Sequence, residues 1–111
     1  MAAAKNDILQ GTLTLLVLKT LASNKRMHGY AITMHVQRVS GDLLRVEEGS
    51  LYPALQKLLL KGWVKASPTI SESGRAVREY RLTAAGRKQL DLERANYRRV
   101  TSAIDAVLEG A

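Results

Sequence analysis

The sequence of 111 residues predicts a mainly α-helical α+β fold, in which three helices precede a two-stranded hairpin and a long last helix. Two observations predict it. Apolar residues recur at helical spacing up to residue 62 and again after residue 83, whereas residues 63–82 combine β-formers with a Pro- and Gly-containing turn. The composition, 46% apolar and 24% charged, is typical of a globular chain and not of a disordered one.

The first predicted helix runs from about Asn6 to Ala22, with Asn6 or Asp7 as its N-cap. Its apolar residues cover much more than one stripe, namely Ile8, Leu9, Leu13, Leu15, Leu16, Val17, Leu18 and Leu21. A helix that is apolar nearly all round is buried on more than one side. In a chain of this length, a second subunit most easily supplies the second buried side.

The second predicted helix runs from about His28 to Val39 and ends at residues 40–42. His28 is expected to cap it, and its apolar stripe consists of Ala31, Ile32, Val36 and Val39.

The third predicted helix begins near Glu47–Ser50, runs to about Lys61 and has Gly62 as its C-cap. One face carries its apolar residues, Leu51, Ala54, Leu55, Leu58 and Leu59. Pro53 fits this helix only in or near the first turn, where a missing N–H matters least.

The helical spacing of apolar residues ends at Gly62. Residues 63–67 predict a short strand, residues 68–74 a turn, and residues 79–82 the return strand. Thr83 is a suitable N-cap for a last helix from about Ala84 to Leu108. Such a helix is roughly 35–40 Å long, which is too long to pack only on a three-helix core of this size.

A seam of apolar residues marks this last helix. Leu90, Tyr97 and Ile104 recur every seven residues, with Val100 and Val107 between them. Glu93 interrupts the earlier matching position, so the heptad is imperfect. The spacing still predicts a dimer seam that resembles a coiled coil.

The element order predicts a winged helix-turn-helix over residues 1–82, with the hairpin as its wing, and a dimerisation helix over residues 83–111. The formal net charge is +7, and residues 1–82 hold twelve of the seventeen Lys and Arg but only six of the ten Asp and Glu. This excess predicts an acidic partner such as DNA for the first part of the chain.

The third helix should enter the major groove with the face opposite its leucines. That face carries five candidate DNA contacts, Ser50, Tyr52, Pro53, Gln56 and Lys57. Arg75 and Arg78 on the wing should reach the backbone or the minor groove. Tyr30 either contacts a phosphate of the DNA or packs against the rest of the protein. The alternatives are that the residues of the third helix form an ordinary polar face and that the wing arginines lie in a solvated turn.

Several classes of function are disfavoured. The chain has no cysteine, and its two histidines, His28 and His35, are not spaced as a helical metal pair, so we expect no metal site and no cofactor. No catalytic set of residues or phosphate-binding loop is present, so we expect no enzyme. The longest apolar run, residues 15–18, excludes a membrane span, and without a signal pattern we expect a cytoplasmic protein.

The chain resembles the PadR family of bacterial transcriptional regulators from about Leu9 to Leu90. The most specific segment is Gly49-Ser50-Leu51-Tyr52-Pro53-Ala54-Leu55. Supporting segments are Gly11-Thr12-Leu13, His28-Gly29-Tyr30, Glu48, Gly62-Trp63-Val64, Tyr80-Arg81-Leu82-Thr83 and Gly86. The single C-terminal helix is similar to that of the short subfamily.

The resemblance implies a homodimeric repressor that binds a near-palindromic operator and that a small effector releases in many members. It implies DNA contacts for Tyr30, Ser50, Tyr52, Pro53 and Lys57, and a dimer interface that joins the first and last helices. The expected interface residues are Leu9, Leu13, Leu16, Leu90, Tyr97, Val100, Ile104 and Val107. A protein-interaction module and a nonspecific nucleoid-binding protein remain the alternatives.

Overall fold

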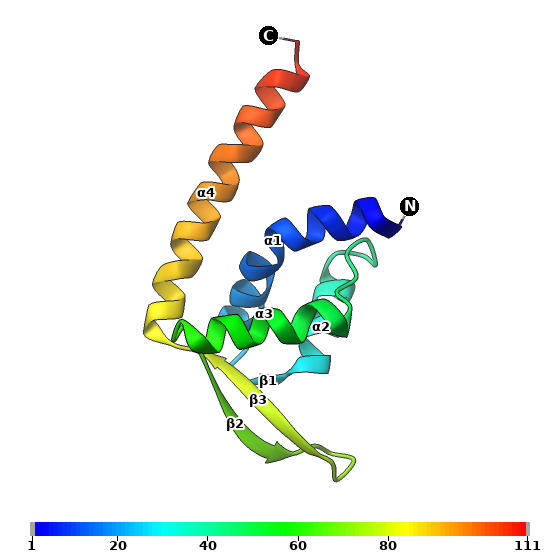
Figure 1. Ribbon diagram of the computed structural model, residues 1–111, viewed down its shortest axis with the longest axis vertical. Coiled ribbons are helices and arrows are strands. Elements are labelled where there is room, and N and C mark those ends of the chain that lie inside the picture. The colour runs from blue at the N-terminus through cyan, green and yellow to red at the C-terminus, as the bar shows by residue number, and fades with distance from the viewer. Residues whose placement is uncertain (1, 111) are drawn as a thin grey trace.

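The computed structural model describes the backbone of residues 2–110 and the side chains of residues 12–110. The elements in chain order are α1 (Ala2–Ser23), β1 (Met27–His28), α2 (Gly29–Val39), α3 (Glu48–Leu60), β2 (Val64–Ile70), β3 (Ala76–Leu82) and α4 (Ala84–Leu108). They form the predicted α+β winged helix-turn-helix with a long C-terminal helix (Figure 1).

Helix α1 begins earlier than the sequence predicts. Asn6 and Asp7 lie inside it, so neither is its N-cap. The alanines at positions 2–4 are the strongest helix formers, which extends the helix toward the N-terminus. The side chain of Leu9, an expected interface residue, lies outside the described side chains.

The sheet has three antiparallel strands in the order β1-β3-β2, not the predicted two. The third strand, β1, contains only Met27 and His28, which pair with Tyr80 and Glu79 of β3. Two residues are too few to show a periodicity, so no sequence pattern predicts this strand.

The wing, which comprises β2, β3 and the turn between them, is longer than predicted. Residues 68–70, expected in the turn, belong to β2, and Pro68 pairs with Arg78. Because β2 is an edge strand, Pro68 can sit there without removing a hydrogen bond from the sheet. The turn is confined to residues 71–75, and Gly74 adopts a φ of 84° there.

The core forms where α1, α2, α3 and the base of the wing meet. Its fully buried side chains are Val17, Leu18, Ile32, Leu51, Leu55, Leu58 and Val64. These include the leucines predicted for the inner face of α3. Val39, placed by the periodicity on the apolar stripe of α2, is 69% exposed because it is the last residue of that helix.

Pro53 lies in the second turn of α3 rather than the first, because the helix begins at Glu48. Its ring removes the hydrogen bond that an N–H at this position would donate to the carbonyl of Gly49, close to the start of the helix. At the other end, Lys61 is the C-cap, and Gly62 follows it with a φ of 76°.

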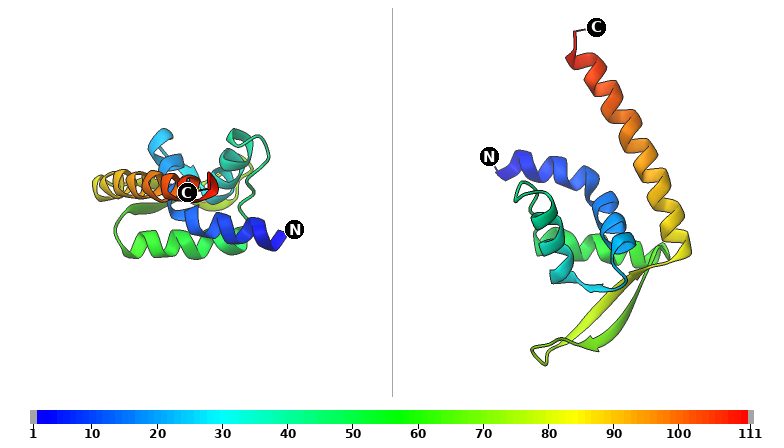
Figure 2. Two further views of the ribbon diagram at one scale, coloured as in Figure 1. Left: turned by 90° about the horizontal axis from the view of Figure 1, so that it is seen from above. Right: turned by 180° about the vertical axis from the view of Figure 1, so that it is seen from behind.

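Thr83 fastens the start of α4 to the turn that follows α3. Its backbone N–H donates to the Trp63 carbonyl at 3.1 Å. Its hydroxyl donates to the Gly62 carbonyl at 2.7 Å and accepts from the Gly86 N–H at 3.0 Å. One side chain therefore caps α4 and sets where it leaves the body, from which its second half projects (Figure 2).

Substitution of Thr83 by Ala should lower the free energy of unfolding by about 1–2 kcal/mol, because both hydroxyl hydrogen bonds are lost. Thr83→Ser, which keeps the hydroxyl, is the control and should cost less than about 0.5 kcal/mol. Chemical denaturation at one protein concentration measures both. Equal stability of the two variants would show that the cap contributes nothing.

Candidate nucleic-acid interface

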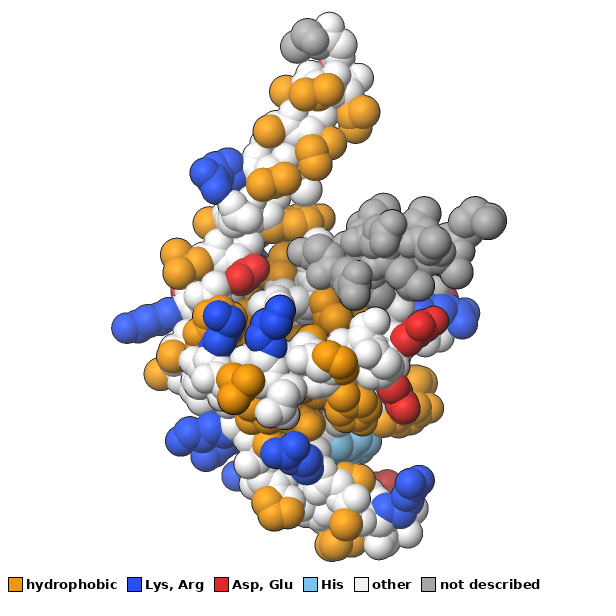
Figure 3. All heavy atoms as spheres, in the orientation of Figure 1, with side chains coloured by type: hydrophobic (Ala, Val, Ile, Leu, Met, Phe, Trp, Pro, Cys, Tyr) orange, Lys and Arg blue, Asp and Glu red, His pale blue; other side chains and the backbone are white. Residues whose placement is uncertain are grey.

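The exposed face of α3 carries the side chains predicted to contact DNA. Leu51, Leu55 and Leu58 anchor the helix in the core, which turns the opposite face to solvent. On or beside that face lie Ser50, Tyr52, Pro53, Gln56 and Lys57, of which only Ser50 is half-buried. Figure 3 shows this side of the molecule, with Lys and Arg side chains on the body around α3 and on the wing.

A hollow of about 720 Å³ lies where the N-termini of α2 and α3 approach the wing. We call it the wing hollow. Its lining residues are His28, Gly29, Tyr30, Glu48, Tyr52, Arg75, Ala76, Val77, Arg78 and Tyr80. Four predicted contacts from three separate segments, Tyr30, Tyr52, Arg75 and Arg78, thus meet in one place. The other four, Ser50, Pro53, Gln56 and Lys57, do not line it and belong to α3 alone.

His28 caps α2, as predicted. Its Nδ1 accepts a hydrogen bond from the Ala31 N–H at 3.3 Å. This contact places the ring proton on Nε2. Tyr30, two residues further on, is 56% exposed and lines the wing hollow, so its side chain is not buried in the core.

Tyr52 packs directly on the backbone of Gly29. A Cβ added at position 29 would lie 2.5 Å from the Tyr52 hydroxyl oxygen, so only glycine permits this contact. Burial on this side and the neighbouring carboxylate of Glu48 raise the pKa of Tyr52 above its ordinary value of 10.0. The hydroxyl therefore keeps its proton at neutral pH and can donate to a phosphate oxygen.

The two wing arginines supply positive charge to the wing hollow. The Arg78 guanidinium lies 6.0 Å from the ring centroid of Tyr80, a buried tyrosine of β3. This contact holds Arg78 against the wall of the hollow. Arg75 follows the turn at the tip of the wing, where its backbone N–H donates to the Ser71 hydroxyl at 3.2 Å.

Gly29, Glu48 and Tyr80 are among the lining residues of the wing hollow that were not predicted as DNA contacts. The sequence indicated them only as parts of predicted helices, of the return strand and of the family resemblance. Their joint position depends on how β3 packs beside α2 and α3, which no local pattern encodes.

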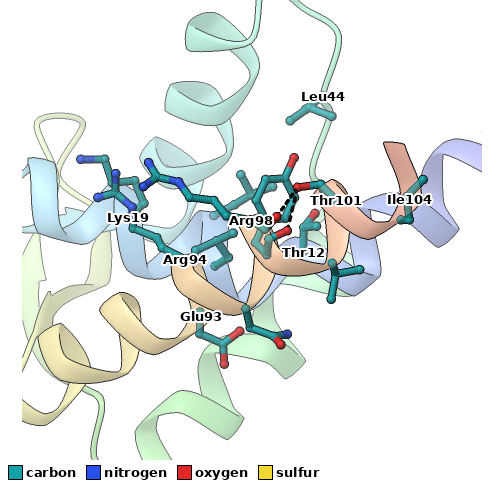
Figure 4. A pocket seen from close by; sticks show the side chains of 13 residues that line it. Thr12, Lys19, Leu44, Glu93, Arg94, Arg98, Thr101 and Ile104 are labelled. Carbon is teal, nitrogen blue, oxygen red and sulfur yellow. Dashed lines mark hydrogen bonds between the residues drawn. The ribbon is translucent and has the colours of Figure 1, made fainter. Parts of the chain in front are cut away.

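A second depression, the α1–α4 groove of about 760 Å³, separates the two long helices. Leu15, Leu16, Tyr97, Val100 and Ile104 give it an apolar floor. The basic side chains of Lys19, Arg94 and Arg98 gather at one end of it (Figure 4).

The expected interface residues divide into two sets. Leu13 and Leu90 are only 5% and 4% exposed within one chain, so they belong to its own core and offer little surface to a partner. Tyr97, Val100, Ile104 and Val107 are roughly half or more exposed, and Leu16 is half-buried beside the groove. Among the expected interface residues whose side chains the structure describes, only this second set is exposed enough to contact a second subunit.

Neither a metal cluster nor a membrane-spanning helix occurs in the described residues. No group of three or more His, Asp or Glu there could hold a metal ion. No helix in that part of the chain is long and apolar enough to cross a membrane.

Comparison with known proteins agrees with this architecture. Residues 17–92 match the model of the transcriptional regulator PadR-like family. A PadR family transcriptional regulator from Eggerthella lenta superposes with a TM-score of 0.83 at 23% identity, covering 99% of this chain and 93% of that one. A transcriptional regulator from Clostridium thermocellum gives 0.81 at 22% identity, covering 90% and 96%.

A third solved structure, Bacillus subtilis PadR in complex with operator DNA, has a TM-score of 0.64 and is 26% identical. The match covers 72% of this chain and 46% of that chain. This chain therefore spans less than half the length of that relative.

Proposed function

Because the chain belongs to the PadR-like family of transcriptional regulators, we propose that it binds a specific operator as a homodimer and represses transcription. The observation that carries the proposal is the wing hollow, where two arginines and two tyrosines from three segments converge beside the exposed face of α3. The operator complex of Bacillus subtilis PadR supports it by the shared fold.

In the proposed complex, α3 enters the major groove. Gln56 suits the paired donor and acceptor of adenine, and Lys57 suits guanine or a phosphate. The hydroxyls of Ser50, Tyr30 and Tyr52 suit phosphate oxygens. Arg75 and Arg78 follow the backbone or enter the minor groove.

The proposed dimer joins the exposed apolar residues of α4 to the α1–α4 groove of the partner. Tyr97, Val100 and Ile104 are about half exposed, and they would otherwise leave apolar surface in water along a projecting helix. A two-fold dimer would place the two recognition helices about 34 Å apart, one turn of DNA. The footprint on the operator should then be symmetric.

Release by a small effector is part of the proposal. The α1–α4 groove supports it, since it combines an apolar floor with basic side chains at one end. A ligand that shifts α4 relative to α1 would change the distance between the two α3 helices of a dimer.

A competition titration tests this function. The protein is titrated against DNA from upstream of its own gene, with random DNA as competitor, at two salt concentrations. A specific regulator should prefer the upstream fragment and lose affinity steeply with salt. Equal binding to both DNAs would favour a nucleoid role. A protein-interaction module would not bind even at low salt.

Two substitutions should weaken operator binding without unfolding the chain. Lys57→Ala removes an exposed base of α3, and Tyr52→Phe removes the hydroxyl while the ring keeps its contact with Gly29. Each should lower affinity about 10- to 100-fold, because a dimer loses two contacts. Fluorescence anisotropy with the operator measures the loss.

Lys88→Ala is the matched control, since it removes an exposed lysine of α4 that lines neither depression. It should reduce affinity less than about threefold. If Lys57→Ala and Tyr52→Phe both behave like this control, α3 does not contact the operator.

A further inference from the structure

Glu48 is the one acidic residue among those that line the wing hollow. It lies in the first turn of α3 and is exposed, opposite a wall that carries Arg75 and Arg78. A carboxylate that faces DNA is repelled by phosphates. Its position therefore lowers affinity for DNA in general unless it meets a hydrogen-bond donor.

Stabilisation of the helix dipole does not explain why an acidic side chain faces the wing hollow at position 48. Glu47 precedes Glu48 at the N-cap, carries the same side chain, is exposed and does not line the wing hollow. Either residue would stabilise the helix start equally well. Only Glu48 is turned toward the surface shared with Tyr52 and the wing.

The carboxylate of Glu48 is also available for a partner. Within the described side chains it forms no ion pair or hydrogen bond, and neither wing arginine is paired with it. Its neighbour Tyr52 is close enough for the carboxylate to raise the pKa of that phenol. Glu48 and Tyr52, four residues apart, thus share one side of α3.

The chemistry of duplex DNA limits what a carboxylate can accept from. In the major groove, only the amino groups of cytosine and adenine donate hydrogen bonds to a side chain. Adenine places its N7 acceptor next to its amino group, and this lone pair repels a carboxylate. Cytosine places only a C–H on that side. A lone carboxylate at the start of α3 is therefore best matched by cytosine.

We propose that Glu48 determines operator specificity by accepting a hydrogen bond from a cytosine amino group in each half-site, and by repelling the phosphates of DNA that lacks it. This inference rests on the proposed function, because it requires α3 to lie in the major groove. Glu48 then both selects a base and weakens binding to nonspecific DNA.

Selection of binding sites from a pool of randomised duplexes tests the proposal. The parent protein and three variants, Glu48→Gln, Glu48→Asp and Glu47→Gln, are each used to select sites. Anisotropy then measures the affinity of each for a selected site and for random DNA. The parent should require cytosine at one position of each half-site.

Glu48→Gln should lose the preference for cytosine at that position alone, by roughly 10- to 100-fold, and favour adenine there. Its affinity for random DNA should rise. Glu48→Asp keeps the charge but shortens the reach, so it should lose the cytosine preference while random DNA remains weakly bound. Glu47→Gln, which removes the same charge one residue away, should keep the cytosine preference.

Two results would overturn the proposal. Parent sites without a required cytosine would exclude the contact, and equal base preferences for Glu48→Gln and Glu47→Gln would reduce Glu48 to a general charge at the helix start. Failure of the proposed function is distinct from both, because the parent itself would then select no sequence. Circular dichroism of each exposed-surface variant verifies that the fold is retained.

Discussion

Replacing Gly86 with Ala is expected to lower the free energy of unfolding by about 2–3 kcal/mol and the melting temperature by roughly 10 °C. Gly86 lies in the first turn of α4, where it is buried against the backbone of Trp63, between α3 and β2. A Cβ there would overlap the carbonyl oxygen of Trp63 and come within 2.8 Å of Leu82 Cδ1. That carbonyl also accepts from the Thr83 N–H, so it cannot move away cheaply.

Gly49→Ala is the matched control. Gly49 also lies in a helix, but a Cβ there would meet nothing within 4 Å. Alanine should therefore stabilise the chain slightly through its better helix propensity, by up to about 1 kcal/mol. Thermal unfolding at equal protein concentration measures both variants. If Gly86→Ala also gains stability, the start of α4 does not lie as close to the Trp63 backbone as the structure places it.

Gly86 shows which features of the fold cannot be predicted from local sequence. It appears in the sequence as a helix-weakening residue near a predicted N-cap, and Thr83 was identified as that cap from its type alone. The reason for the glycine is a backbone oxygen 23 residues earlier in the chain, at Trp63. Contacts between distant segments have no local signal, whereas helical periodicity and the N-caps His28 and Thr83 are local features and could be predicted.

The wing and the apolar seam of α4 likewise combine features that local sequence predicts with features that depend on tertiary packing. The alternation in residues 79–82 predicted the return strand, but the first strand was predicted too short because Pro68 usually marks a turn. Leu90 fitted the heptad as well as Tyr97 did, and only packing distinguishes them. Leu90 lies over the core, whereas Tyr97 lies beyond its edge.

The candidate DNA contacts follow a similar pattern. Residues of α3 could be assigned to one exposed face because the leucines define the opposite face. Their convergence with Tyr30, Arg75 and Arg78 depends on the packing of β3 beside α2 and α3. The position of Glu48 in the same hollow is the least predictable part of the site, since an acidic residue at a helix start has an ordinary local explanation.

The double substitution Tyr97→Glu with Ile104→Glu is expected to produce monomers and to reduce operator affinity by at least about 100-fold. Both side chains are about half exposed, seven residues apart on α4, and line the α1–α4 groove. Four carboxylates buried in one dimer interface would lack partners and would repel one another. A monomer has one recognition helix instead of two, so the gain from binding both half-sites together is lost.

The matched control is Leu92→Glu with Ala106→Glu. These residues are exposed on the same helix, each lies outside the heptad seam, and neither lines the groove. Sedimentation should show dimers for the parent and for this control, and monomers for the Tyr97 and Ile104 variant. Monomers that still bind the operator as tightly as the parent would separate DNA recognition from dimerisation. An unchanged mass for the Tyr97 and Ile104 variant would place the dimer interface elsewhere, because no well-packed apolar seam tolerates two glutamates in each copy.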